Sequence, residues 1–179
     1  MTGFCFYSVQ KCSFVGKCGI FWVKGDKKMF RGVHNINLDA KGRMAIPARY
    51  RQLLHESNDG ALIVTIDTEE KCLLVYPLNE WEPIQAKIEA LPSFNPAARR
   101  IQRLIIGHAT DIDMDANGRL LLPAPLREYA GLEKKMIMMG QGNKFELWDE
   151  EHWSDRRQSY LEAMRDETEL PEELMNLSL

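Results

Sequence analysis

The pentapeptide Asp39-Ala40-Lys41-Gly42-Arg43 has a second version later in the chain, Asp115-Ala116-Asn117-Gly118-Arg119. The likeness extends past these five positions, because residues 38–48 align with residues 114–124. An internal repeat of this kind indicates that one supersecondary unit is used twice. The sequence therefore predicts a duplicated architecture built around two equivalent loops.

Each copy has the turn chemistry of a β-hairpin. An Asp side chain accepts a hydrogen bond from its own backbone two residues on, and a Gly supplies a positive φ. Asp39 and Gly42 hold these positions in the first copy, and Asp115 and Gly118 hold them in the second. Polar and apolar residues alternate before each turn, and a short apolar run follows it, which favours strands. Strands are expected at 35–38, 44–46, 111–114 and 120–122. We predict that each copy folds back on itself as a β-hairpin, with an arginine just after the tip.

Further elements are predicted from local patterns in both copies. Short helices with a proline near the first turn are expected at 47–54 and 124–130. Asn95-Pro96 combines a capping side chain with a proline at the first helical position, which indicates a helix that continues to Ile106. Buried strands are expected at 61–66, 72–76, 135–139 and 144–148. The last two of these are joined by a predicted loop at 140–143.

The repeat divides the chain into five segments. These are an atypical N-terminal extension at 1–28, a first repeat at 33–81, a helical connector at 82–106, a second repeat at 107–153, and a C-terminal helix and tail at 154–179. Trp81 aligns with Trp153, so the second copy is four residues shorter. The extension holds five lysines and a single acid, Asp26, and we expect it to be disordered or to come from a miscalled start upstream of Met29. The alternative is a basic arm that contacts nucleic acid.

Composition narrows the class of protein. The 179 residues are 45% hydrophobic and carry a formal net charge of −3, as in an ordinary globular chain. No apolar run reaches the roughly 18 residues that a membrane-spanning helix needs. The cysteines contain no C-x-x-C pair and favour neither a disulfide framework nor a zinc site. They are Cys5, Cys12, Cys18 and Cys72. We expect a cytoplasmic protein with reduced thiols.

Calcium binding and catalysis are both disfavoured. The stretch 113–118 matches the opening of an EF-hand loop, but Ala124 stands at the twelfth position, where a bidentate Glu is needed. The first copy also places Lys41 where a ligand belongs. The four histidines do not align between the copies, and no nucleophile–base spacing or glycine-rich phosphate loop is present. We predict no catalytic residues, no metal and no cofactor.

The arginine after each turn is the candidate functional residue. The repeat keeps Arg43 and Arg119. A guanidinium on a hairpin is suited to bidentate contact with phosphate, or with guanine in a major groove, which admits a two-stranded ribbon. Lys41 and Arg51, which aligns with Arg127, add positive charge near the first copy. The alternative is that each arginine only pairs with its aspartate to close the turn. The residues thus indicate a candidate nucleic-acid binder, and a protein-interaction scaffold remains the other class.

From Met29 onward the chain resembles the MraZ family of bacterial transcriptional regulators. The likeness rests on the two D-x-x-x-R hairpins and on the stretches 29–32, 99–108 and 143–148. It implies an α+β fold of two tandem SpoVT-AbrB-type β-rich units, a swapped-hairpin or double-split barrel with short helices. It also implies a ring-shaped homo-oligomer in the cytoplasm, associated with the nucleoid. Its partner would be double-stranded DNA at direct repeats in the promoter of its own operon, in the division and cell wall gene cluster, which it would repress. No membrane and no small-molecule substrate are implied.

The resemblance assigns roles to individual positions of the two motifs. DNA contacts are expected first from Arg43 and Lys41 and then from Arg119. Lesser support is expected from Arg31, Arg49 and Arg51. The residues expected to shape the turns are Asp39, Gly42, Asp115 and Gly118. Asn117 departs from the basic character of Lys41, so the two copies are not expected to contribute equally.

Overall fold

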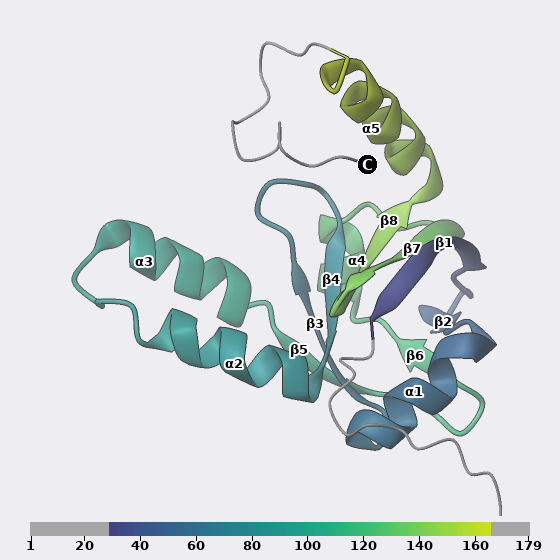
Figure 1. Cartoon of the computed structure of the whole chain (residues 1–179), viewed down its shortest axis with the longest axis horizontal. Coiled ribbons are helices and arrows are strands. Elements are labelled where there is room, and N and C mark those ends of the chain that lie inside the picture. The colour runs from purple at the N-terminus through teal and green to yellow at the C-terminus, as the bar shows by residue number, and fades with distance from the viewer. Residues whose placement is uncertain (1–28, 166–179) are drawn as a thin grey trace, which may run out of the picture.

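The computed structural model describes residues 29–165, and in that range it holds two antiparallel sheets and several short helices (Figure 1). The predicted extension at 1–28 and the end of the predicted tail lie outside the described residues. In chain order the elements are β1 (Phe30–Asn37), β2 (Arg43–Ala45), α1 (Ala48–Asn58), β3 (Ala61–Ile66), β4 (Leu73–Pro77), α2 (Leu78–Glu89), α3 (Pro96–Ile101), the π-helical segment η1 (Gln102–Ile106), β5 (Thr110–Asp113), β6 (Arg119–Leu121), α4 (Ala124–Tyr129), β7 (Lys135–Gly142), β8 (Lys144–Asp149) and α5 (Glu150–Ala163).

Strands of the two copies interleave in the large sheet. Its order is β1-β7-β8-β4-β3-β5, so β1 of the first copy pairs with β7 of the second, and β5 of the second pairs with β3 of the first. The small sheet pairs β2 with β6, one strand from each copy. The α+β class that the resemblance implied is confirmed, and the exchanged strands agree with its swapped-hairpin form.

The predicted hairpin pairing is confirmed only at each tip, where the Asp39 amide donates to the Arg43 carbonyl and the Asp115 amide to the Arg119 carbonyl, both at 2.9 Å. Beyond the tips the strands pair elsewhere. Each turn forms, but among the described residues the two sides of the first turn share one isolated bridge, between Leu38 and Met44. β2 and β6 are three residues long, too short to be stable as separate two-stranded hairpins. By pairing with each other they bury Met44 and Leu120, which are 1% and 0% exposed, in one shared core. Burial across the copies therefore outweighs the local hairpin.

The predicted strands and short helices are present with shifted ends, but the predicted loop at 140–143 is wrong. β7 continues to Gly142, and Gln141 lies opposite Lys144, which leaves a tight turn. Gly142 has a φ of +71°, which glycine adopts without the clash of a Cβ. The first copy has the longer connection 67–72 at this place, called here the β3–β4 loop. The four residues that the second copy lacks are accommodated there.

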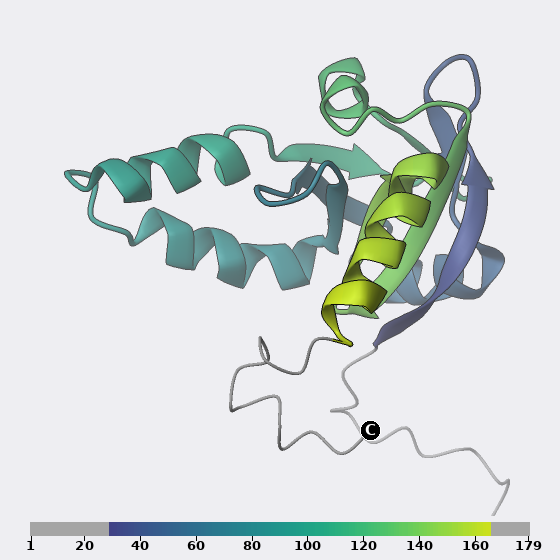
Figure 2. The same ribbon diagram turned by 90° about the horizontal axis from the view of Figure 1, so that it is seen from above.

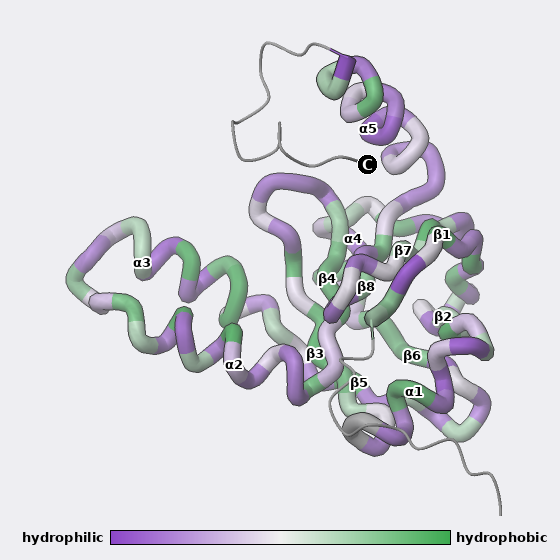
Figure 3. Tube along the Cα trace, in the orientation of Figure 1, coloured by the Kyte–Doolittle hydropathy of each residue, from purple (hydrophilic) through white to green (hydrophobic). Residues whose placement is uncertain are grey.

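Each face of the large sheet has its own hydrophobic cluster. On one face, side chains from both copies pack under α1, α4 and the β2–β6 ribbon, with Phe30, Tyr50 and Phe145 in mutual aromatic contact. On the other face, Trp81 of α2 and Trp148 of β8 belong to a second cluster, against which η1 and α5 pack in part. Figure 3 shows apolar residues along the central strands and a mixed pattern on the projecting helices. Neither copy has a core of its own.

Cys72 lies in the second cluster and is fully buried. Burial is the first cause that raises the pKa of its thiol, with the charge of Glu146 adding to it, so the thiol stays protonated at neutral pH. The other three cysteines lie outside the described residues. Among the helices of residues 29–165, none is long and apolar enough to cross a bilayer.

A two-helix arm, formed by α2, α3 and η1, projects from the sheet (Figures 1 and 2). Asn95 caps α3 as predicted, because its Oδ1 accepts the backbone amide two residues on at 2.8 Å. Gln102 Nε2 donates to the Ile88 carbonyl at 3.1 Å and joins the two helices. Thr65 Oγ1 donates to the Ile105 carbonyl at 2.6 Å and ties η1 to the central strand β3. The arm is therefore attached to the sheet by a buried side chain.

Candidate nucleic-acid interface

The first turn is organised by the carboxylate of Asp39. Its Oδ1 accepts the backbone amides of Lys41 at 2.9 Å and Arg43 at 2.8 Å, and its Oδ2 accepts Arg43 Nε at 2.7 Å. Gly42 has a φ of +81° and donates its own amide to the Asp39 carbonyl at 2.9 Å. One carboxylate thus shapes the backbone of the turn and also orients the guanidinium that follows it.

The second turn repeats this geometry. Asp115 Oδ1 accepts the backbone amides of Asn117 and Arg119, both at 2.8 Å, and Gly118 has a φ of +73°. The difference lies in the side-chain pair, because Arg119 Nε stands 3.9 Å from Asp115 Oδ2. In both turns the aspartate accepts backbone amides and the glycine adopts a positive φ.

Both aspartates have a pKa that is lowered by the turn itself. The pKa of Asp39 is lowered from its ordinary 3.8, first by the hydrogen bond from the Arg43 amide and next by the Arg43 side chain. The pKa of Asp115 is also lowered, first by the Arg119 amide, and the charge of Arg43 contributes to it. The charge of Arg43, from the other copy, is the smallest of the causes that lower the pKa of Asp115.

The two copies brace each other's turns. The Gly118 carbonyl accepts the Ile46 amide of the first copy at 2.8 Å, and the Gly42 carbonyl accepts the Leu122 amide of the second copy at 2.9 Å. A Cβ built on Gly118 would stand 2.3 Å from Arg51 Cδ, so the Arg51 side chain lies directly on that glycine. Arg127 lies on Gly42 in the same way, at 2.9 Å from the built Cβ to Nε. Each turn is therefore held from the opposite copy.

The β2–β6 ribbon turns its two arginines toward solvent. Its register sets Arg43 opposite Leu121 and Ala45 opposite Arg119. Side chains alternate along a strand, so these four share the outer face while the intervening residues are buried. The side chains of Arg43 and Arg119 are 39% and 41% exposed. This outer face is called the ribbon face below, and it presents one guanidinium from each copy.

The remaining predicted contacts lie at different places. Lys41 is exposed at the tip of the first turn. Arg31 and Arg49 are exposed beside β1 and α1, and the Arg49 guanidinium lies 4.8 Å from the centre of the Tyr50 ring. Arg51 is partly buried, and its Nε donates to the Ile46 carbonyl at 2.7 Å. The structure thus gives Arg51 a bracing contact, while DNA contact by it or by the others stays a prediction.

Arg127 and Leu121 belong to this region but received no role in the sequence analysis. Arg127 Nε donates to the Leu122 carbonyl at 3.1 Å, which is the counterpart of the Arg51 bond. The alignment of Arg51 with Arg127 was the signal that could have indicated a shared structural task. Leu121 is 57% exposed on the ribbon face, and no local pattern marks it as an outward residue.

The residues that would be calcium ligands in an EF-hand loop make other contacts or face solvent. Asp115 uses Oδ1 for two backbone amides, and Asp113 is exposed on β5 opposite Ala61. Within residues 29–165, no three His, Cys, Asp or Glu side chains form a group that could hold a metal ion.

The fold and the site together define an α+β protein of two tandem repeats that are interlocked by exchanged strands and expose paired arginines on a β-ribbon. A family model described as "MraZ protein, putative antitoxin-like" matches residues 29–104 and again residues 105–172. The chain therefore belongs to the MraZ family, as the resemblance indicated.

Curated relatives support this membership along their whole length. The chain is 55% identical over 152 residues to a protein of Halorhodospira halophila, and 55% identical over 152 residues to one of Coxiella burnetii. It is 52% identical over 151 residues to a protein of a Marinomonas species. Each match covers 84% of this chain and 100% of the relative, and all three relatives are named "Transcriptional regulator MraZ". The family is one of regulators, not of enzymes.

Proposed function

We propose that this chain is a sequence-specific DNA-binding regulator of transcription. It binds direct repeats in the promoter of its own operon, in the division and cell wall gene cluster, as a homo-oligomeric ring, and represses that operon. It acts in the cytoplasm on the nucleoid. The observation that carries the proposal is the ribbon face, where Arg43 and Arg119 stand on one two-stranded sheet. The names of the relatives support the regulatory class.

The ribbon face has the shape and chemistry that a major groove accepts. A groove of B-DNA admits a two-stranded β-ribbon, and a bidentate arginine on guanine is the commonest specific contact. Asp39 holds Arg43 through Nε, which leaves the two terminal nitrogens of the guanidinium to form a fork toward the DNA. A side chain held in place before binding loses less entropy on binding. Lys41 at the neighbouring tip adds a phosphate contact.

The net negative charge of the chain means that one protomer alone binds DNA weakly, so several copies must bind together. A chain of net charge −3 gains little from long-range attraction to DNA, and few cations per protomer reach the groove. Several identical ribbon faces on evenly spaced repeats gain avidity, on the order of a hundredfold or more. Assembly into a ring therefore converts a weak site into a useful one.

The test is an Arg43→Ala variant in a gel-shift titration on the upstream region of the chain's own gene. Loss of one bidentate contact costs roughly 1–3 kcal/mol per site, so affinity should fall by about fivefold to a hundredfold. Light scattering should give an unchanged oligomer mass, because Arg43 is exposed. Arg157→Ala, which removes an exposed arginine of α5, is the matched control and should bind like the wild type. Wild-type affinity of the Arg43→Ala variant would show that the ribbon face is not the DNA contact.

A further inference from the structure

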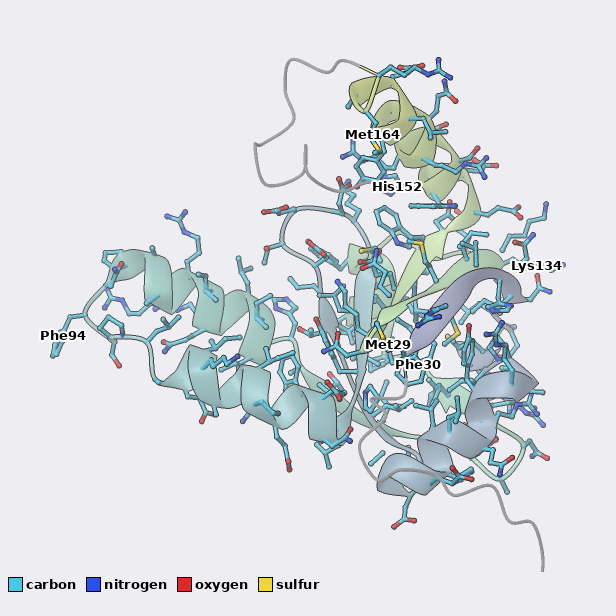
Figure 4. All side chains as sticks on the ribbon, in the orientation of Figure 1. Met29, Phe30, Phe94, Lys134, His152 and Met164 are labelled. Carbon is cyan, nitrogen blue, oxygen red and sulfur yellow. The ribbon has the colours of Figure 1, made fainter. Side chains whose placement is uncertain are left out.

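The arm carries an exposed surface that the proposed DNA contact does not use. Phe94, at the tip between α2 and α3, is 96% exposed, and Ile101 is 42% exposed. Figure 4 shows Phe94 pointing away from the rest of the molecule. Arg99, Arg100 and Arg103 are exposed on the same short helical stretch. Within the described residues no acidic side chain forms an ion pair with these three arginines. Exposed apolar residues rimmed by charge mark an interaction surface.

A groove lined by acidic side chains, in contrast to the basic arm, lies between the β3–β4 loop, β7 and α5. It encloses about 340 Å³. Its lining combines four acidic side chains with aromatic and other residues, and the acids are Asp67, Glu69, Glu70 and Glu146. Trp153 and Tyr160 also line the groove, and the Arg156 guanidinium of the same chain lies 5.0 Å from the centre of the Tyr160 ring. We call this feature the acidic groove.

The acidic groove is preformed by hydrogen bonds between its walls. Glu70 accepts from Arg156 and, at 2.8 Å, from Tyr160 Oη, which joins the β3–β4 loop to α5. Tyr129 Oη donates to the Asp67 carbonyl at 2.6 Å and joins the same loop to α4. Glu69 is exposed at the rim and forms no ion pair within the described residues. Within the described residues Glu70 is ion-paired with Arg156 and Glu146 with Lys144, so Asp67 and Glu69 are the acids of the groove that have no ion pair.

The floor of the acidic groove is also defined. Glu146, 6% exposed, accepts from Lys144 Nζ and from Trp148 Nε1, both at 3.0 Å. The groove depends on the asymmetry between the repeats, because the β3–β4 loop has only a tight turn as its counterpart in the second copy. The acidic groove therefore belongs to the first copy's loop and has no equivalent at the tight turn of the second copy.

We propose that the arm of a second copy of this chain docks in the acidic groove, with its exposed arginines, Arg100 foremost, against Asp67 and Glu69, and with Phe94 against apolar side chains of α5. This contact would hold together the homo-oligomer of the proposed function, and the inference rests on that function. The opposite charges of the two surfaces select the second copy as occupant. No residue of the arm lines the groove in its own chain, so the contact is between molecules.

Such a contact is heterologous, because the arm and the groove are different surfaces. A heterologous contact repeated from chain to chain closes into a ring when its rotation permits, and otherwise builds an open filament. Exposed apolar side chains on both partners add a non-polar part to the interface. On α5 these are Tyr160, Leu161 and Met164, at 39%, 49% and 59% exposure. The ribbon face takes no part in the contact and stays free for DNA.

The test is a charge exchange measured by light scattering of the full chain. Arg100→Glu and Glu69→Arg each place like charges across the contact, so each should raise its dissociation constant at least about tenfold and reduce the oligomer mass toward that of a monomer. The double variant restores opposite charges and should recover the wild-type mass. Circular dichroism checks that each variant is folded.

Two controls are matched in charge and exposure. Lys87→Glu changes the other helix of the arm, and Glu82→Arg changes a second groove, of about 420 Å³, at the root of the arm. Both should keep the wild-type mass. The docking would be overturned if both single variants kept the wild-type mass or if the double variant did not recover it. It would also be overturned if only Glu82→Arg lost mass, or if the wild type were a monomer. Loss of DNA binding in Arg43→Ala with unaltered masses in the charge variants would reject the docking and leave the proposed function standing.

Discussion

At the scale of single residues, the glycine of each turn serves two purposes. Its positive φ shapes the turn, and its lack of a Cβ lets an arginine of the opposite copy lie against the backbone. At Gly118 the built Cβ stands 2.3 Å from Arg51 Cδ, whereas at Gly131, with a φ of +60°, no atom lies within 4 Å. A Cβ at Gly131 would therefore meet only backbone strain, whereas a Cβ at Gly118 would also clash with Arg51.

We expect Gly118→Ala to destabilise the protein more than Gly131→Ala. A left-handed conformation costs a non-glycine residue roughly 1–2 kcal/mol, and both variants incur that cost. Gly118→Ala must also displace Arg51, so its total should reach about 2–4 kcal/mol. Urea denaturation measures both free energies of unfolding. Equal losses in the two variants would mean that Arg51 moves aside freely and does not brace the turn.

At the scale of elements, one buried hydroxyl connects the arm to the sheet. Thr65 is 0% exposed on β3, and its Oγ1 reaches the Ile105 carbonyl in η1 at 2.6 Å. A π-helical segment has a looser backbone than an α-helix and often marks a functional site. The bond fixes the segment from which α3 leaves the sheet, so it positions the arm.

We expect Thr65→Val to lower the free energy of unfolding by about 1–3 kcal/mol, because the shape is kept while a buried carbonyl loses its donor. Thr110→Val is the matched control, since its hydroxyl makes only a 3.3 Å bond to the carbonyl of His108, two residues away. It should change stability by less than about 0.5 kcal/mol. Thermal or urea unfolding of both variants decides the matter. A neutral Thr65→Val would show that η1 does not need this bond.

At the scale of the whole molecule, the interlocked copies behave as one unit with two outward functions. The ribbon face lies on the β2–β6 sheet, while the arm and the acidic groove lie on other elements. The separation allows DNA contact and subunit contact to occur together. Affinity should therefore depend on the number of copies that one DNA molecule can engage.

We expect gel-shift affinity to rise steeply from probes with one direct repeat to probes with two or three, on the order of a hundredfold in total. The dissociated variant Arg100→Glu should lose this dependence and should bind all probes like the wild type on one repeat. Raising the salt concentration should weaken every complex, because phosphate contacts release counterions. Wild-type binding that ignores repeat number would contradict an avid assembly.

Much of the local structure was predictable from sequence. The Asp-x-x-Gly-Arg turns, the flanking strands, and the Asn95 cap all form, because each depends on contacts within about five residues. The repeat and the motif residues also sufficed to indicate the family, which the relatives confirm. Conformational preference at a turn is local, and a single sequence carries that information.

Only the tertiary structure decided which strands pair and what the arginines touch. β2 and β6 find each other because strands of three residues are stabilised by the core they jointly bury, not by their own turns. For the same reason Arg51 and Arg127 brace glycines that are far away in the chain, and the β3–β4 loop meets α5. These contacts depend on long-range burial, and the residue patterns near each element contain no signal of its distant partner.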